Sequence, residues 1–122
     1  MNILVLDVYP DVDYRISKDQ NGGYGTANNY GNTLFTRFLK LIVNKSIDFP
    51  PLFSVQVIGE LKNNHHKVKF EKKVPKNLNN FDFVIIASSI VCHETEIKTI
   101  KSIKSHNKVV FAIGPFATSN LT

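Results

Sequence analysis

The chain has 122 residues, of which 43% are apolar, and a formal net charge of +5. This length has room for one domain, and this apolar content is ordinary for a globular fold, which excludes a disordered tail. No apolar run approaches the roughly 18 residues of a membrane span, and Met1 leads into a strand rather than a signal sequence, so we expect no membrane segment and a cytoplasmic location.

Two further function classes are disfavoured by composition. The lysines are scattered and form no dense cluster with interleaved aromatic residues, which argues against a nucleic-acid-binding surface. The lone cysteine, Cys92, excludes an internal disulfide and a cysteine-ligated metal site built from this chain. Any metal-cluster chemistry would have to come from elsewhere.

The first expected element is a strand over residues 2–8, because NILVLDV is a continuous apolar run too short for a helix. Pro10 ends it. Residues 9–33 then form a long insert rich in Gly, Asn and Tyr, and a loop of this length is usually functional or mobile. Its glycines lack the spacing of a dinucleotide fingerprint and do not follow a strand directly, so a flexible or partner-contacting loop is favoured over a nucleotide loop.

Two helices and a strand are expected next. Residues 33–43 are predicted to form an amphipathic helix, with Leu34, Phe38, Leu41 and Ile42 on one face. Pro50 and Pro51 suit the start of a second helix, over residues 52–64. Residues 66–71 alternate as a half-exposed strand does, which places this strand near the sheet edge.

The last third of the chain predicts a buried strand over residues 81–89 that ends in small polar residues, and a helix over residues 94–105. The inward positions of that helix are expected to be Ile97, Ile100 and Ile103. A buried-looking strand follows over residues 108–113, and the turn at Gly114 leads to the start of another helix.

Strands that alternate with helices indicate a parallel sheet. The expected fold is α/β and flavodoxin-like (Rossmann-like), with three layers and a mainly parallel sheet whose two most apolar strands lie side by side at its centre. Compared with that fold, the chain looks truncated after the fourth strand. An open edge would then favour self-association of the truncated chain.

Ligands of open parallel sheets bind beyond the carboxyl ends of the strands. Those ends are expected at residues 7–10, 87–90 and 114–118, which are small, apolar or hydroxyl-bearing and carry few charges. Such a rim suits a large, partly apolar ligand better than acid–base catalysis, and we therefore expect no catalytic residue and no metal ligand in this chain.

Other readings of single residues are weaker. Asp7 ends a strand, but a phosphorylatable aspartate would need a preceding acidic pair and a later lysine, and neither is evident. Cys92 and His93 are neighbours that point apart on a helix, so a structural role is favoured. His65 and His66 close a helix, where a cationic ring is favourable to the dipole.

The segments FPPLFSVQVIGELKNNHHKVKF, FDFVIIASSIVCHETEIKTIKSIKS and KVVFAIGPFAT together resemble the N-terminal cobalamin (B12)-binding domain of B12-dependent radical SAM proteins. The residues at the family's typical places are Pro50, Pro51, Leu52, His66, Val68, Asp82, Ser88, Ser89, Gly114 and Thr118. The resemblance covers residues 1–8 and 48–118. The Asp-x-His-x-x-Gly motif that ligates cobalt by histidine is absent, and Pro115 stands where the family usually has a second glycine.

The resemblance implies a single B12-binding-like domain, incomplete at its C-terminus, that presents cobalamin to a downstream radical SAM domain for methyl transfer or radical rearrangement. The 4Fe-4S cluster and S-adenosylmethionine would belong to that domain, and cobalt would have no histidine ligand. The implied cofactor contacts are Tyr9, Pro10, Pro51, Leu52, Ser88, Ser89, Ile90, Gly114, Pro115, Phe116 and Thr118. The alternative is a non-catalytic flavodoxin-like regulatory or protein-interaction domain, and a small stand-alone enzyme is disfavoured.

Overall fold

The structure is a computed structural model that describes residues 1–10, 18–19, 33–46 and 50–119. Its elements in chain order are β1 (Asn2–Leu6), α1 (Leu34–Ser46), α2 (Leu52–Asn63), β2 (Lys67–Glu71), β3 (Phe83–Ala87), α3 (His93–Lys104), β4 (Val109–Ile113) and α4 (Pro115–Ser119). The expected strands and helices are thus present, with shifted ends. The glycine-rich part of the 9–33 insert lies outside the described residues.

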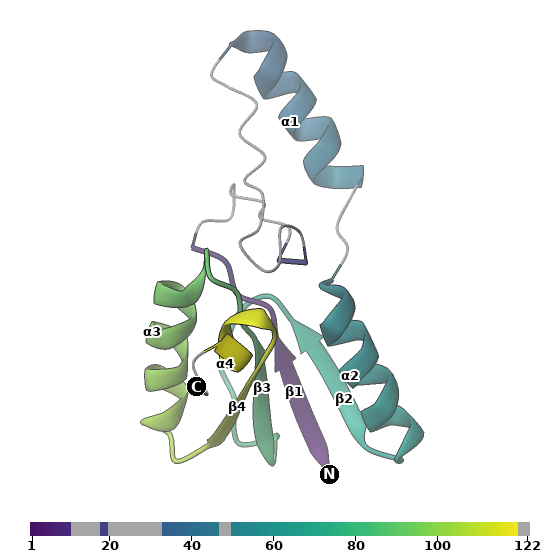
Figure 1. Cartoon of the computed structure of the whole chain (residues 1–122), viewed down its shortest axis with the longest axis vertical. Helices are drawn as coiled ribbons and strands as arrows, with labels where there is room; N and C mark the ends of the chain where they lie inside the picture. Colours follow the sequence, from purple (N-terminus) through teal and green to yellow (C-terminus); the bar gives the residue numbers. More distant parts are fainter. Residues whose placement is uncertain (11–17, 20–32, 47–49, 120–122) are drawn as a thin grey trace.

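The four strands form one parallel sheet in the order β2-β1-β3-β4 (Figure 1). This order is that of a flavodoxin-like α/β fold, in which the strand order reverses between β1 and β3. The prediction that the two most apolar strands lie side by side at the centre is confirmed, as is the edge position of the strand at 67–71.

The sheet has a helix on each face because successive residues of a strand point to opposite sides. Leu4 and Leu6 of β1 pack in a cluster that includes Ile103 of α3. Ile3 and Val5 of β1 pack in a second cluster with residues of α2. The fold therefore has three layers, and α2 and α3 flank the sheet in Figure 1.

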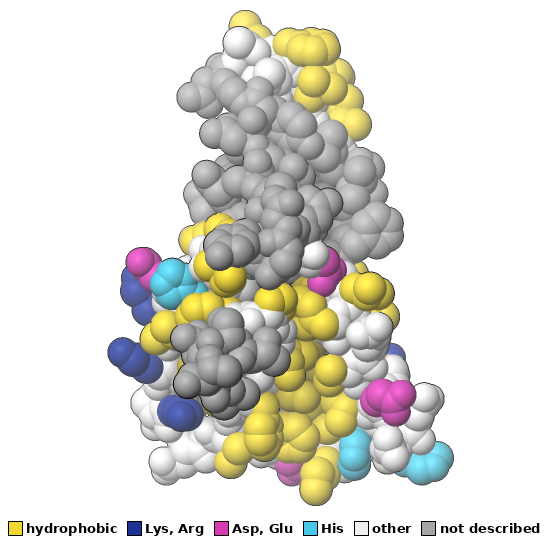
Figure 2. All heavy atoms as spheres, in the orientation of Figure 1, with side chains coloured by type: hydrophobic (Ala, Val, Ile, Leu, Met, Phe, Trp, Pro, Cys, Tyr) yellow, Lys and Arg dark blue, Asp and Glu magenta, His cyan; other side chains and the backbone are white. Residues whose placement is uncertain are grey.

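The expectation that the last strand is buried is wrong. β4 lies at the edge of the sheet, and Val109 and Phe111 are 58% and 52% exposed. Register places both on the same face as Phe83 and Ile85, and the Phe111 ring meets the Phe83 ring edge-on at 5.4 Å. Figure 2 shows hydrophobic side chains exposed over the strands below α4. An apolar run alone could not distinguish a central strand from an edge strand with an open face.

α1 is helical as predicted, but its apolar face is open. In Figure 1 the helix lies beyond the carboxyl ends of the strands, away from the sheet. The large apolar side chains that remain exposed there are Leu34, Phe35, Phe38, Leu41 and Ile42. Their spacing places them on one stripe of the helix, as the amphipathic pattern predicted, but this stripe is exposed.

The end of α2 explains the two adjacent histidines. The backbone N–H of His66 donates to Leu61 O and that of His65 donates to Lys62 O, both at 3.0 Å, which is the Schellman pattern of helix termination. His65 takes the left-handed conformation that this pattern requires, with φ of 61°. The pair therefore ends a helix, in agreement with its structural interpretation.

Because glycine adopts positive φ without the steric cost that a Cβ brings, His65→Gly is expected to stabilise the fold by about 1 kcal/mol. Urea denaturation of the two proteins would measure this gain. Asn107→Gly is the matched control: Asn107 also has positive φ, at 56°, but asparagine tolerates this conformation, so its gain should be smaller. Loss of stability in His65→Gly would contradict a role limited to ending the helix.

Candidate functional site at the carboxyl edge of the sheet

A buried lysine occupies the carboxyl edge between β1 and β3, where the strand order reverses. The side chain of Lys18 is fully buried, and its ammonium lies 2.9 Å from Asp7 Oδ1 and 2.9 Å from Glu96 Oε1. It also donates to the backbone carbonyls of Val8 and Ala87, at 3.0 and 2.9 Å. One cation thus joins β1, β3 and α3.

Each carboxylate of this cluster has a second partner. The hydroxyl of Tyr9 donates to Asp7 Oδ2 at 2.7 Å, and the Tyr9 ring lies 4.9 Å from the Lys18 ammonium. Both oxygens of Glu96 accept from the backbone N–H of Ser89, at 3.1 and 3.0 Å. The cluster therefore holds two strand ends and the turn that follows β3.

The ion pairs raise the pKa of Lys18. Burial is the largest single influence and lowers this pKa, but the adjacent carboxylates of Asp7 and Glu96 together outweigh it. Lys18 is therefore charged at neutral pH. One buried ammonium thus faces the carboxyl groups of two residues.

The neighbouring residue of the insert makes a separate contact. The carboxylate of Asp19 accepts from the backbone N–H of Leu52, at 2.5 Å, at the start of α2. The preceding residue, Pro51, provides no side-chain cap for this helix. An acidic side chain at a helix N-terminus satisfies a free N–H and opposes the helix dipole. Lys18 and Asp19 therefore attach this part of the insert to the ends of β1 and β3 and to the start of α2.

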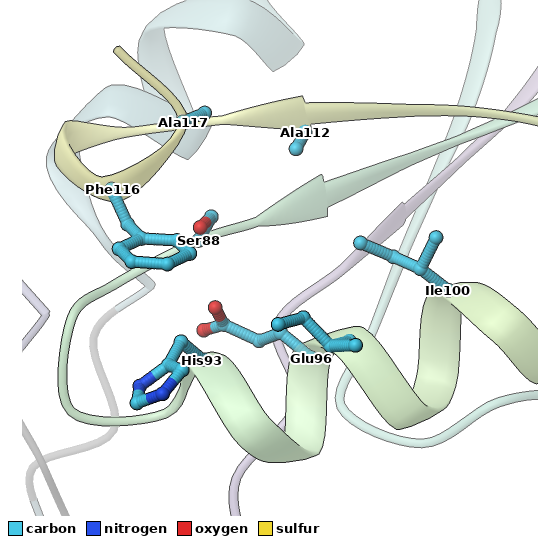
Figure 3. Close-up of a pocket in the computed structure, with 8 residues that line it drawn as sticks. Ser88, His93, Glu96, Ile100, Ala112, Phe116 and Ala117 are labelled. Atoms are coloured by element: carbon cyan, nitrogen blue, oxygen red, sulfur yellow. The ribbon is translucent and has the colours of Figure 1, made fainter. Parts of the chain in front are cut away.

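A small hollow lies beside this cluster, between α3, β4 and α4 (Figure 3). Its volume is about 130 Å³, and its lining residues are Ser88, His93, Glu96, Ile97, Ile100, Ala112, Phe116 and Ala117. Figure 3 shows the Phe116 ring and the His93 ring at one end of the hollow, and their centroids are 5.3 Å apart. Because ligand pockets usually measure about 300–1,000 Å³, this one would accept only part of a larger ligand.

The predicted site residues gather along this edge in two groups. Tyr9 adjoins the cluster around Lys18, and Leu52 begins α2 beside Asp19. Pro10 and Leu52 are exposed, whereas Pro51 is buried. Ser88 and Phe116 line the hollow, with half-buried Ile90 and Pro115 close in sequence. Thr118 belongs to α4, and its side chain lies outside the described residues.

The two predicted serines are less accessible than a ligand-facing rim would suggest. Ser88 is 3% exposed and Ser89 is fully buried. The Ser89 hydroxyl accepts from the backbone N–H of Cys92 at 3.2 Å, which orders the turn before α3. The Cys92 thiol is also buried, and this burial raises its pKa, so a structural role is favoured over a nucleophilic one.

Gly114 is required where β4 turns into α4. Its φ is +115°, and a Cβ at this position would lie closer than 3.0 Å to the carbonyl oxygen of Ser88 and at 3.0 Å from the Phe53 ring. The backbone N–H of Ser88 donates to Ile113 O at 2.7 Å, so the ends of β3 and β4 are already in close contact. The space above Gly114 is therefore filled by the protein itself.

Gly114→Ala is expected to destabilise the fold by about 2–4 kcal/mol, because the new methyl group meets rigid backbone in a conformation that disfavours a side chain. Gly59→Ala is the control, since nothing lies within 4 Å of a Cβ at Gly59. Thermal melting of both variants would measure the difference. Equal melting temperatures would contradict the close approach of the two strand ends.

The histidines are divided between the two edges of the sheet. His65, His66 and His106 precede the amino ends of β2 and β4, whereas His93 begins α3 at the carboxyl edge. The Nδ1 atom of His93 lies 2.6 Å from the carbonyl oxygen of Ile90, so one ring nitrogen of this histidine is engaged with the backbone. Within the described ranges no three residues of the His, Cys, Asp and Glu types are placed to hold a metal ion.

Sequence reasoning missed Lys18, Asp19 and Glu96. Glu96 carried a detectable signal, because it lies four residues before Ile100 and seven before Ile103, on the inward stripe of α3. A charged residue at such a position indicates a buried partner of opposite charge. Lys18 and Asp19 gave no comparable signal, since they lie within a polar segment without periodicity.

No helix in the described part of the chain combines the length and apolar character needed to cross a membrane. Comparisons of the sequence with protein-family models and curated proteins, and of the fold with solved structures, found no match.

Proposed function

We propose that this chain is a cofactor-binding module that presents cobalamin to a radical SAM domain, in the cytoplasm. The observation that carries the proposal is the carboxyl edge of a flavodoxin-like sheet at which the ends of β3 and β4 meet through Ser88 and Gly114. Ligands of this fold bind at that edge. Of the residues that carry the resemblance to the cobalamin-binding family, Pro51, Leu52, Ser88, Ser89 and Gly114 lie along this edge, whereas His66, Val68 and Asp82 lie at the amino ends of β2 and β3.

The mainly apolar lining at this edge suits contact with a large, partly apolar ligand such as a corrin. The hollow beside Phe116 and Ala117 is mainly apolar in its residues, with Ser88, His93 and Glu96 as polar members. Only His93, among the four histidines, lies at this edge, and the histidine motif of the cobalt-ligating branch is absent. The proposed binding therefore uses no histidine on cobalt.

Cobalamin, when bound, would supply a cobalt centre that carries or transfers an alkyl group. The part of this chain is to bind and orient it: Phe116 and Ala117 provide apolar contact, and the lysine cluster holds the turn after β3 in place. The 4Fe-4S cluster and S-adenosylmethionine belong to the partner domain in this proposal.

Absorbance titration of the protein with hydroxocobalamin tests the proposal. Because Ser89 is fully buried, the informative obstruction is Ala117→Trp, which fills the hollow from α4. We expect saturable binding that Ala117→Trp weakens at least about tenfold and that Lys104→Trp, at the far end of α3, leaves unchanged. Absence of saturable binding by the unmodified protein would contradict the proposal.

The exposed stripe of α1 favours a second candidate, a regulatory or protein-interaction domain that pairs with another copy of this chain. Two apolar surfaces stay exposed within one chain: the α1 stripe with Phe38, and the open face of β4 with Val109 and Phe111. They lie in separate parts of the molecule in Figure 1, so two copies could bury both surfaces.

This candidate predicts concentration-dependent self-association. Light scattering should show dimers or larger species, and Phe38→Glu and Phe111→Glu should each shift the population towards the monomer, because each places a charge in an apolar contact. Lys98→Glu on α3 is the control and should have no effect. A strict monomer at all concentrations would contradict this candidate, and cobalamin binding by that monomer would support the first candidate instead.

A further inference from the structure

We propose that Lys18 is a positioning residue, which fixes the Ser88–Ser89 turn at the rim of the proposed cofactor site. The inference deepens the proposed function and rests on it for its binding measurement. Its structural basis is a chain of contacts: Lys18 pairs with Glu96, and Glu96 in turn holds the backbone N–H of Ser89 with both carboxylate oxygens.

The contacts of Lys18 are those of a cation inside an oxygen cage. Four oxygen atoms lie 2.9–3.0 Å from its ammonium, contributed by the side chains of Asp7 and Glu96 and the carbonyls of Val8 and Ala87. The carbonyl of Ala87 immediately precedes Ser88. Lys18 therefore holds the turn after β3 from both sides, by the strand end directly and by the N–H of Ser89 through Glu96.

The residue after Lys18, Asp19, contacts the helix on the other face of the sheet. Asp19 accepts from the N–H of Leu52 at the start of α2, while Lys18 reaches α3 through Glu96. The contacts of Lys18 and Asp19, which we call the clasp, therefore join the helices on opposite faces of the sheet. The position of the clasp at the β1–β3 boundary is the position where ligands approach this fold.

A simpler role for Lys18 would be to neutralise two buried carboxylates, and the triple variant Asp7→Asn/Lys18→Met/Glu96→Gln separates the two roles. It removes all three charges while nearly preserving side-chain volumes, so charge neutralisation is no longer needed. If Lys18 is only a counter-charge, this variant should behave as the unmodified protein does. If Lys18 positions the turn, the turn should loosen although the charges are balanced.

The lone thiol reports on this turn without any cofactor. Cys92 is 1% exposed, and its backbone N–H donates to the Ser89 hydroxyl. We expect the rate of Cys92 labelling by a thiol reagent under native conditions to rise about tenfold or more in the triple variant, through local opening. Glu96→Gln alone, which leaves Lys18 paired one-to-one with Asp7, should fold and show the same change. Lys69→Met, at an exposed ion pair, is the control.

Hydroxocobalamin affinity is the second readout, and we expect it to fall at least about tenfold in both variants at temperatures where each is folded. Labelling and affinity that match the unmodified protein in both variants would overturn the positioning role. If the unmodified protein binds no cobalamin, the proposed function fails, and the Cys92 labelling rates still decide whether the clasp holds the turn.

Discussion

Val5→Asp is expected to prevent folding. Val5 is fully buried at the centre of the sheet, beside Phe70 of β2 and Ile85 of β3. An aspartate there would place a carboxyl group in an apolar cluster, and the described residues around it offer no ion-pair partner. The cost of burying such a group is about 4 kcal/mol or more, which is comparable with the whole stability of a small domain.

Circular dichroism and urea denaturation would measure the effect of Val5→Asp. Val109→Asp is the matched control, because Val109 is 58% exposed on the edge strand and should tolerate the charge at a cost of less than about 1 kcal/mol. A soluble Val5→Asp protein that melts cooperatively near the temperature of the unmodified protein would show that β1 is not at the centre of the sheet.

Lys18→Met is expected to destabilise the fold by about 3–5 kcal/mol, because it leaves two buried carboxylates without their cation. The control Lys69→Met removes a lysine from an exposed pair with Glu71 and should change the unfolding free energy by less than about 1 kcal/mol. Urea denaturation at pH 7 would compare the two. Equal small losses would contradict the buried cluster.

The raised pKa of Lys18 also predicts a pH dependence. Burial lowers this pKa, but the attraction of Asp7 and Glu96 is stronger in sum, so the folded state holds the proton more tightly than the unfolded state does. The stabilisation by the charged lysine is fully present below the unfolded pKa, near 10.4, and is lost as pH rises through the higher folded pKa. Alkaline unfolding curves of the unmodified protein should show this loss, and those of Lys18→Met should lack it.

The sequence predicted the fold well because the fold depends on local patterns. Short apolar runs marked β1 and β3, helical spacing marked α1 and α3, and two prolines marked the start of α2. The burial of β4 was overestimated, since Val109 and Phe111 would be equally apolar in a central strand. Whether an apolar strand lies at the centre or at the edge of a sheet depends on its tertiary neighbours, and periodicity alone does not reveal them.

The candidate site was predicted only in part. The carboxyl ends of parallel strands must share one edge, and that rule placed Ser88 and Gly114 together correctly. The rule did not find Lys18, which reaches the same edge from the insert to pair with Glu96, 78 residues away. Contacts between segments so far apart depend on the folded arrangement, and in the sequence Lys18 looks like an ordinary surface charge.

Histidine-free cobalamin binding is tested most directly by electron paramagnetic resonance of the protein loaded with cob(II)alamin, compared between natural-abundance and ¹⁵N-labelled protein. A histidine on cobalt would give hyperfine splitting that changes with the labelled nitrogen. Because His93 is the only histidine at the carboxyl edge, we expect a bound-state spectrum that is the same for both proteins and for His93→Ala. A splitting that changes with ¹⁵N and disappears in His93→Ala would contradict histidine-free binding at this edge.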